Sequence, residues 1–205
     1  LHVRSRRQRQ MCIRDSVQTA DAAKQEPPAF SLTTGRVRGY HRAAVDTFLA
    51  AARAAFEGDA DDLSAADVRV ASFPLVKNGY VVAEVDAALG RVEDALAARA
   101  RDRVVRSQGA GAWVEQARGE AQVILDHLAR PKRQRFARTG ILTFGYRIDE
   151  VDHVGTRIAR YLRDGEPLTA EQLRSAAFRM QRGGYREEQV DALLDATVDV
   201  ILAVR

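Results

Sequence analysis

The chain has few aromatic residues, a single cysteine and no long apolar run. Only 6% of its 205 residues are aromatic, and Cys12 is the one cysteine. Everything after Cys12 therefore lacks disulfides, thiolate metal ligands and cysteine nucleophiles. No uncharged apolar segment approaches the roughly 18 residues that a membrane-spanning helix needs. These absences exclude an integral helical membrane protein and favour a folded, water-soluble chain.

The net charge of the chain comes from its first residues. The whole sequence carries +4, and residues 1–16 hold five arginines against one aspartate. The remaining residues carry as many acidic as basic side chains, so we expect no nucleic-acid partner. The leader lacks the apolar stretch of a secretory signal, and RRQRQMCIRDS is similar to a translated sequencing adapter. We interpret residues 1–16 as an adapter or cloning artefact and residues 1–29 as a non-native or disordered leader.

A four-fold repeat, here called the Gly-Tyr motif, organises the rest of the chain. In each copy, Val-Asp begins five residues after the tyrosine of Gly-Tyr. The copies are Gly39-Tyr40 with Val45-Asp46, Gly79-Tyr80 with Val85-Asp86, Gly145-Tyr146 with Val151-Asp152, and Gly184-Tyr185 with Val190-Asp191. A phenylalanine precedes the tyrosine by alternately ten and seven residues, at Phe30, Phe73, Phe136 and Phe178. This alternation predicts two homologous halves, 30–108 and 136–205, joined by a connecting helix and basic linker over 109–135.

The spacing within the motif indicates the start of a helix. A tyrosine one residue before the N-cap and a valine at N4 form a hydrophobic staple. The staple therefore explains the tyrosines better than a recognition surface does. The N-cap residues His41, Val81, Arg147 and Arg186 are poor acceptors, whereas Glu84, Glu150 and Gln189 at N3 suit a capping box. We expect the motif glycines to supply a positive φ, and the motif aspartates to compensate helix ends or bond loop amides.

Helical periodicity follows every motif, and the sequence predicts an all-α fold. Apolar residues recur at three- and four-residue steps, and the second copy has a short coiled-coil-like seam. Short helices are expected to begin at Ser64 and Thr169, with Asp67 and Gln172 completing their capping boxes, and a longer one over about 110–129. No alternating strand pattern is present. We expect the two halves to pack as a compact helical domain.

The motif resembles the short N-terminal domain of DivIVA, a bacterial scaffold of division and polar growth. The best matches are Phe73–Leu89 and Phe178–Leu194, and four tandem copies are closer still to the actinobacterial DivIVA-domain repeat proteins. The resemblance implies a non-enzymatic scaffold or adaptor of the cell-division or envelope-growth machinery, with protein partners there. It also implies a cytoplasmic location, peripheral at the inner face of the membrane. The alternative is a soluble cytoplasmic interaction module without membrane affinity.

In DivIVA, an exposed hydrophobe and an arginine just before Gly-Tyr contact an anionic membrane surface. Val37-Arg38 preserves this pair, whereas the other copies have Lys77-Asn78, Thr143-Phe144 and Arg182-Gly183. The resemblance implies contacts in the loops 35–39, 74–79, 139–145 and 181–184. The candidate contact residues are Val37, Arg38, Leu75, Val76, Lys77, Phe144 and Arg182. Because DivIVA chains pair, the duplication predicts either a monomeric pseudo-dimer or a homodimer.

Other chemistry has little support in the sequence. His41, His127 and His153 show no metal-ligand spacing, and no phosphate-binding loop or hydrolase elbow occurs. We therefore predict no enzyme activity and no cofactor. The basic cluster Arg130–Arg135 is interpreted as a solvated linker, with phosphate or headgroup binding as the alternative.

Overall fold

The computed structural model describes residues 29–58 and 63–204. The structure is 62% helical, with seven helices and only short strands in its described part, so the general prediction of a helical protein is confirmed. The strands were not predicted. Residues 1–28, which include the leader interpreted as an artefact, lie outside the described residues.

The helices that follow the Gly-Tyr motifs begin where the motif spacing predicts. In chain order the helices are α2 (Arg42–Glu57), α3 (Ala65–Val70), α4 (Val82–Gln108), α5 (Ala110–Leu128), α6 (Ile148–Asp164), α7 (Ala170–Arg174) and α8 (Glu187–Ala203). Helices α2, α4, α6 and α8 each start two residues after a motif tyrosine, which places that tyrosine at N′ and the motif valine at N4. Both short helices, α3 and α7, begin with the expected capping boxes, at Ser64 and Thr169.

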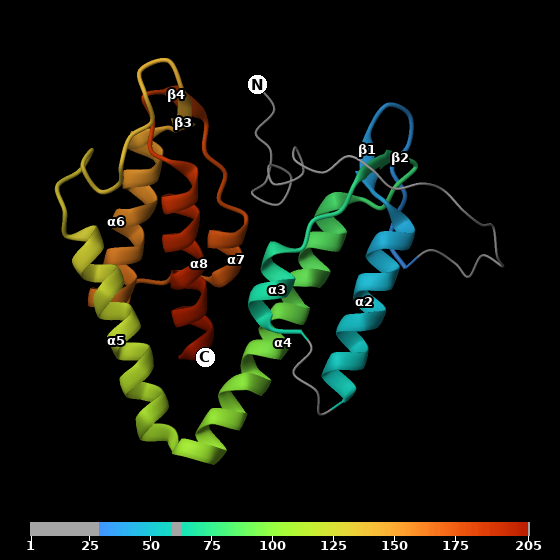
Figure 1. The fold of residues 1–205 in the computed structure, drawn as a ribbon, viewed down its shortest axis with the longest axis horizontal. Coiled ribbons are helices and arrows are strands. Elements are labelled where there is room, and N and C mark those ends of the chain that lie inside the picture. Colours follow the sequence, from blue (N-terminus) through green and yellow to red (C-terminus); the bar gives the residue numbers. More distant parts are fainter. Residues whose placement is uncertain (1–28, 59–62, 205) are drawn as a thin grey trace. The chain divides into compact units, whose positions relative to one another are not determined.

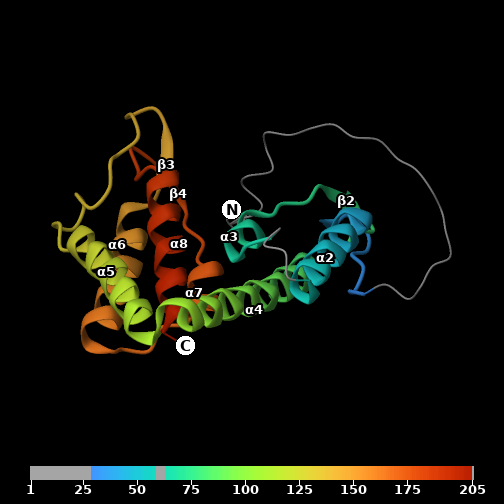
Figure 2. The same ribbon diagram turned by 60° about the horizontal axis from the view of Figure 1, so that its bottom comes forward.

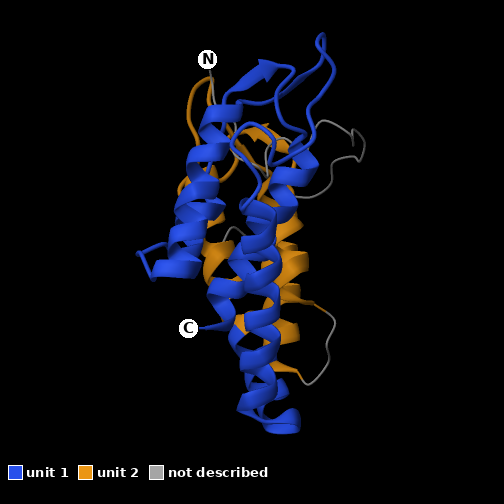
Figure 3. Ribbon diagram, turned by 90° about the vertical axis from the view of Figure 1, so that its left-hand side faces the viewer, with its two compact units in different colours: residues 1–6, 98–205 blue, residues 7–97 orange. Residues whose placement is uncertain are grey.

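The described residues form two compact units, coloured separately in Figure 3. We call residues 29–97 the N-terminal unit and residues 98–204 the C-terminal unit; the division falls within α4. Each unit contains two copies of the motif. Within the C-terminal unit, α5 contacts both α6 and α8, and the three helices lie side by side (Figures 1 and 2). Helix α5, expected in a connecting segment, is thus part of this unit's helical packing.

A two-stranded antiparallel sheet joins the two motif copies of each unit. In the N-terminal unit β1 (Arg38–Tyr40) pairs with β2 (Leu75–Lys77), and in the C-terminal unit β3 (Phe144–Tyr146) pairs with β4 (Met180–Arg182). Next to each sheet the two motif tyrosines exchange backbone hydrogen bonds, all four of them 2.9 Å long. Strands of three residues are too short to show an alternating pattern, which explains why periodicity did not reveal them.

The phenylalanine that precedes each motif copy packs against the tyrosine of the other copy in the same unit. Phe30 precedes Tyr40 in the chain but packs edge-on against Tyr80, while Phe73 precedes Tyr80 and packs against Tyr40, with centroids 5.2 and 5.4 Å apart. In the C-terminal unit Phe136 likewise contacts Tyr185. The two copies therefore share one core, and the tyrosine of each depends on the phenylalanine of the other.

The motif glycines allow close approach of two backbones and do not have a positive φ, so that expectation was wrong. The glycines with positive φ are Gly35, Gly109, Gly165 and Gly183, none of them directly before a motif tyrosine. A Cβ at Gly39 would lie 2.2 Å from the Tyr80 carbonyl oxygen, and one at Gly145 would lie 2.3 Å from that of Tyr185. A side chain at either position would separate the strands.

Capping of the long helices also differs from expectation. His41 was expected to be a poor acceptor, but its Nδ1 accepts from the backbone N–H of Ala44 at 3.3 Å. The side chains at the predicted N3 positions accept hydrogen bonds from backbone N–H groups that are distant in the sequence. Glu84 accepts from the N–H of Ser31 at 2.8 Å, and Glu150 and Gln189 accept from Arg179 and Ala137 at 2.8 and 2.9 Å. These side chains tie a helix start to the segment leading into the other motif copy.

Candidate functional site: the strand ends of the two units

Each motif aspartate accepts a hydrogen bond from the tyrosine of the other copy in its unit. The four bonds, 3.1 to 3.2 Å long, join Tyr40 to Asp86, Tyr80 to Asp46, Tyr146 to Asp191 and Tyr185 to Asp152. All four tyrosines are at most 2% exposed. These tyrosine–aspartate bonds were not predicted from the sequence. The expected bond from an aspartate to a loop amide does occur at Asp152, which accepts from the N–H of Arg133 at 2.6 Å. The residues shared by all four copies thus tie each motif tyrosine to the start of the helix that follows the other copy.

Burial of the motif tyrosines makes the stability of the fold depend on pH in the alkaline range. Burial raises the pKa of Tyr80, and the hydrogen bond to Asp46 raises it further. Burial is also the main cause of the raised pKa of Tyr185, with Asp152 adding to it and the amide of Arg135 opposing it. The folded-state pKa of each of these two tyrosines lies above the ordinary value of 10.0. The stability that their neutral hydroxyls contribute is therefore intact below about pH 10 and is lost as the pH rises through the folded pKa.

We therefore expect the free energy of unfolding to fall above about pH 10, and to fall less steeply when both tyrosines are replaced by phenylalanine. Urea denaturation over a series of alkaline pH values measures this. The variant Tyr80→Phe with Tyr185→Phe is compared with the unchanged chain at each pH. Equal alkaline slopes for the two proteins would show that these hydroxyls do not cause the alkaline loss of stability.

The strand end of the N-terminal unit presents mainly charge. Arg38 lies opposite Lys77 in the sheet register, and both are exposed. Val37 next to Arg38 is 63% exposed, whereas Leu75 and Val76 are half-buried. Two cations and one aliphatic side chain from different motif copies thus share this end.

The strand end of the C-terminal unit combines an aromatic ring with a cation. Phe144 is 53% exposed and lies opposite Arg182 in the register of β3 and β4. The Arg182 guanidinium carbon lies 5.6 Å from the centroid of the Phe144 ring, within the range of a cation–π contact. The sequence showed no loop holding an aromatic residue and an adjacent cation. The sheet supplies this combination from two copies.

The most exposed apolar residues of this end were not singled out from the sequence. Ile141 and Leu142 are 87% and 83% exposed. They occupy the middle of a turn that the N–H of Thr143 closes by donating to the carbonyl of Gly140 at 2.9 Å. The Thr139 hydroxyl also donates to the Thr143 carbonyl at 2.9 Å, so the loop is held by its own bonds. An Ile-Leu pair inside a loop with turn residues is the signal that would have found them.

We call Ile141, Leu142, Phe144 and Arg182 the apolar tip. Its three hydrophobic side chains are exposed in the described structure, with a guanidinium against the aromatic ring. Exposed apolar groups beside a cation suit the interfacial region of an anionic membrane or an apolar partner surface.

The basic cluster before the second half is only partly solvated. Lys132 and Arg133 are exposed, as the linker interpretation expects, but Arg135 is buried. Its guanidinium donates to the carbonyl of Asp152 at 2.9 Å and to the Thr156 hydroxyl at 3.3 Å. Arg135 therefore anchors the segment to α6, and the linker interpretation is wrong for this residue.

Neither a metal cluster nor a membrane-spanning helix is found in the described ranges. No group of three or more His, Cys, Asp or Glu side chains within residues 29–58 and 63–204 is arranged to hold a metal ion. None of the helices in these ranges combines the length and the apolar character needed to cross a bilayer.

Comparisons of the chain with protein-family models, curated proteins and solved structures give no match. The likeness to DivIVA therefore rests on the motif residues themselves.

Proposed function

We propose that the protein is a non-enzymatic scaffold or adaptor of the bacterial cell-division or envelope-growth machinery. In this proposal it attaches peripherally to the inner, anionic face of the cell membrane through its strand ends and binds protein partners of that machinery. The observation that carries the membrane attachment is the exposure of Ile141 and Leu142 at the apex of a loop beside Phe144 and Arg182. The division setting comes from the DivIVA-like motif.

The chemistry of the apolar tip supports weak, reversible insertion. Transferring a large apolar side chain fully out of water contributes about 1.5–3 kcal/mol. A cation near an anionic bilayer surface adds about 1 kcal/mol, and this part is weakened by salt. Two or three partly inserted side chains with one arginine therefore give binding that depends on both lipid charge and ionic strength.

Replacing the apex tests this proposal. We expect Ile141→Ser with Leu142→Ser to lower the partition of the full chain onto anionic vesicles by at least about tenfold, because two apolar side chains no longer enter the bilayer. Co-sedimentation with phosphatidylglycerol-containing vesicles at low and high salt measures it. Val114→Ser with Val123→Ser is the matched control, because both valines are exposed on α5 outside the tip, by 51% and 70%. Surface positions such as these should leave the melting temperature nearly unchanged.

Two results would contradict membrane attachment by this tip. Equal pelleting of the double variant and the unchanged chain would remove the apex from the binding surface. Failure of the unchanged chain to pellet with any anionic vesicle would favour the soluble interaction module, with the same apolar apex available to a protein partner.

A further inference from the structure

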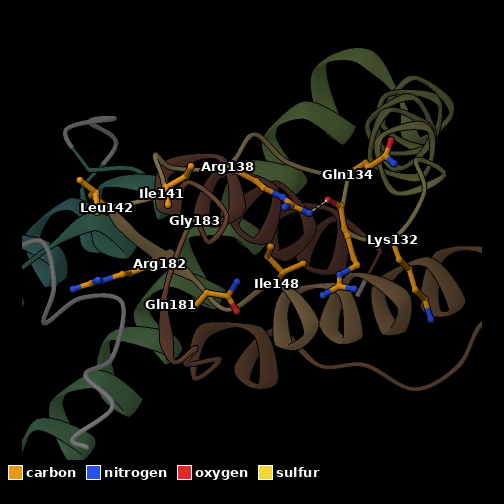
Figure 4. A pocket seen from close by; sticks show the side chains of 10 residues that line it. Lys132, Gln134, Arg138, Ile141, Leu142, Ile148, Gln181, Arg182 and Gly183 are labelled. Carbon is orange, nitrogen blue, oxygen red and sulfur yellow. Dashed lines mark hydrogen bonds between the residues drawn. The ribbon is translucent and has the colours of Figure 1, made fainter.

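A groove with an unusual charge lies beside the apolar tip in the C-terminal unit (Figure 4). Its lining includes four cations, Lys132, Arg133, Arg138 and Arg182, and no carboxylate. Figure 4 shows Arg182 with Ile141 and Leu142 at one end, Lys132 towards the other and Arg138 between them. We call this feature the basic groove. The four cations therefore line the same groove as the exposed apolar residues Ile141 and Leu142.

The turn that carries Arg133 is held in a conformation that its sequence disfavours. Arg133 has φ +69°, and few residues other than glycine adopt the left-handed region. Its N–H donates to the carboxylate of Asp152 at 2.6 Å, and its carbonyl accepts from the Arg138 guanidinium at 3.0 Å. Asp152 is 4% exposed and also accepts from Tyr185 at 3.2 Å. Asp152 thus joins the motif's tyrosine–aspartate bond to the backbone of Arg133, whose carbonyl in turn holds Arg138. Backbone held in this way is typical of functional sites.

The cations of the basic groove are not paired with the acidic side chains that the structure describes. Within residues 29–58 and 63–204 none of its four cations forms an ion pair. Lys132 and Arg133 also line an adjacent hollow that contains Asp149 and Asp152. Asp149 is paired with Arg147 at 2.7 Å, and Asp152 is buried in the bonds just described. The cations therefore remain available to an anion from outside.

We propose that the basic groove binds the terminal phosphate of an anionic lipid headgroup. This inference rests on the proposed membrane attachment and adds a ligand class to it. A terminal phosphate offers three acceptor oxygens and up to two negative charges, which several guanidinium and ammonium groups can share. Ile141 and Leu142, at one end of the groove, favour a phosphate that belongs to a lipid over one free in solution or in a nucleic acid. In this proposal their side chains contact the acyl chains of the bound lipid.

The test compares two anionic lipids at equal surface charge. The full chain is sedimented with phosphatidylcholine vesicles that contain phosphatidic acid, which has a terminal phosphate, or phosphatidylglycerol, which has none. We expect about fivefold tighter binding to phosphatidic acid, the effect of roughly one additional cation–phosphate interaction. Arg133→Gly with Arg138→Gln should abolish this preference. Glycine keeps the left-handed backbone of the turn while removing the cation.

A control variant that loses the same number of positive charges distinguishes a specific phosphate site from general electrostatic attraction to the vesicle. Arg118→Gln with Arg163→Gln removes two exposed arginines of the same unit outside the groove and should keep the preference. Equal binding to both lipids, or an equal loss in both double variants, would overturn the groove while leaving membrane attachment standing. No binding to either lipid would overturn both proposals. A rise in melting temperature with inorganic phosphate alone, absent in Arg133→Gly, would assign the groove to a soluble phosphate instead.

Discussion

Replacing Gly145 with alanine is expected to destabilise the C-terminal unit by about 3 kcal/mol or more, or to prevent its folding. The added Cβ would lie 2.3 Å from the Tyr185 carbonyl oxygen, 3.0 Å from the carbonyl carbon of Gly184 and 2.9 Å from a methyl of Thr139. Two of these atoms are backbone of the segment that follows β4, so the clash is relieved only by separating the two motif copies. The backbone bonds between Tyr146 and Tyr185 would be lost with that movement.

Urea denaturation followed by circular dichroism measures the effect of this substitution. Gly119→Ala is the matched control, because a Cβ at Gly119 in α5 meets nothing within 4 Å. Alanine is the better helix former, so this control should be neutral or stabilising by up to about 1 kcal/mol. If Gly145→Ala unfolded at the same urea concentration as Gly119→Ala, the close approach of the two backbones at Gly145 would be refuted.

Removal of the Asp152 carboxylate is expected to have the second large effect. Asp152→Ala leaves the buried Tyr185 hydroxyl and the Arg133 amide without their acceptor, and each such loss costs about 1–3 kcal/mol. Asp152→Asn keeps one acceptor oxygen and should be less damaging. The free energy of unfolding from urea titration should therefore fall in the order unchanged chain, asparagine variant, alanine variant.

A surface aspartate provides the comparison for Asp152. Asp126 is exposed on α5 and accepts a hydrogen bond from Gln122 at 2.7 Å, so Asp126→Ala should change stability by less than about 0.5 kcal/mol. Similar losses for Asp126→Ala and Asp152→Ala would mean that the cross-copy bond contributes nothing special. The alanine variant at 152 should also weaken binding to phosphatidic acid, because it frees the turn that carries Arg133.

Local sequence signals predicted the helices well. The staple spacing located the starts of α2, α4, α6 and α8, and the capping boxes at Ser64 and Thr169 located α3 and α7. Both kinds of signal act within one turn of the helix they begin, so they are legible without knowledge of the rest of the fold.

Contacts between motif copies were not predictable in the same way. The aspartate of one copy bonds the tyrosine of the other, and Gly39 faces the backbone of Tyr80. The residue spacing within a single copy does not indicate which other copy it contacts. The repeat nevertheless contained the information, because invariant residues that local capping does not need indicate a contact between copies.

The candidate site was predicted in part for the same reason. Phe144 and Arg182 were each selected from the sequence, but their contact depends on the register of β3 and β4. Ile141 and Leu142 were not predicted as contact residues, although they stand five and four residues before Tyr146, where Leu75 and Val76 stand before Tyr80. The basic groove needed the left-handed turn at Arg133, which no local sequence rule predicts.

Fluorescence of a tryptophan placed in the apolar tip reports directly whether this tip enters the bilayer. Phe144→Trp adds an indole to the exposed ring position, while the native Trp113, whose N–H bonds the Ala203 carbonyl at 2.9 Å, serves as an internal reference. With anionic vesicles containing brominated phosphatidylcholine, we predict strong quenching of the variant, little quenching of the unchanged chain, and reversal by high salt. Equal, weak quenching of both proteins in vesicles that bind them would contradict insertion of the tip into the membrane.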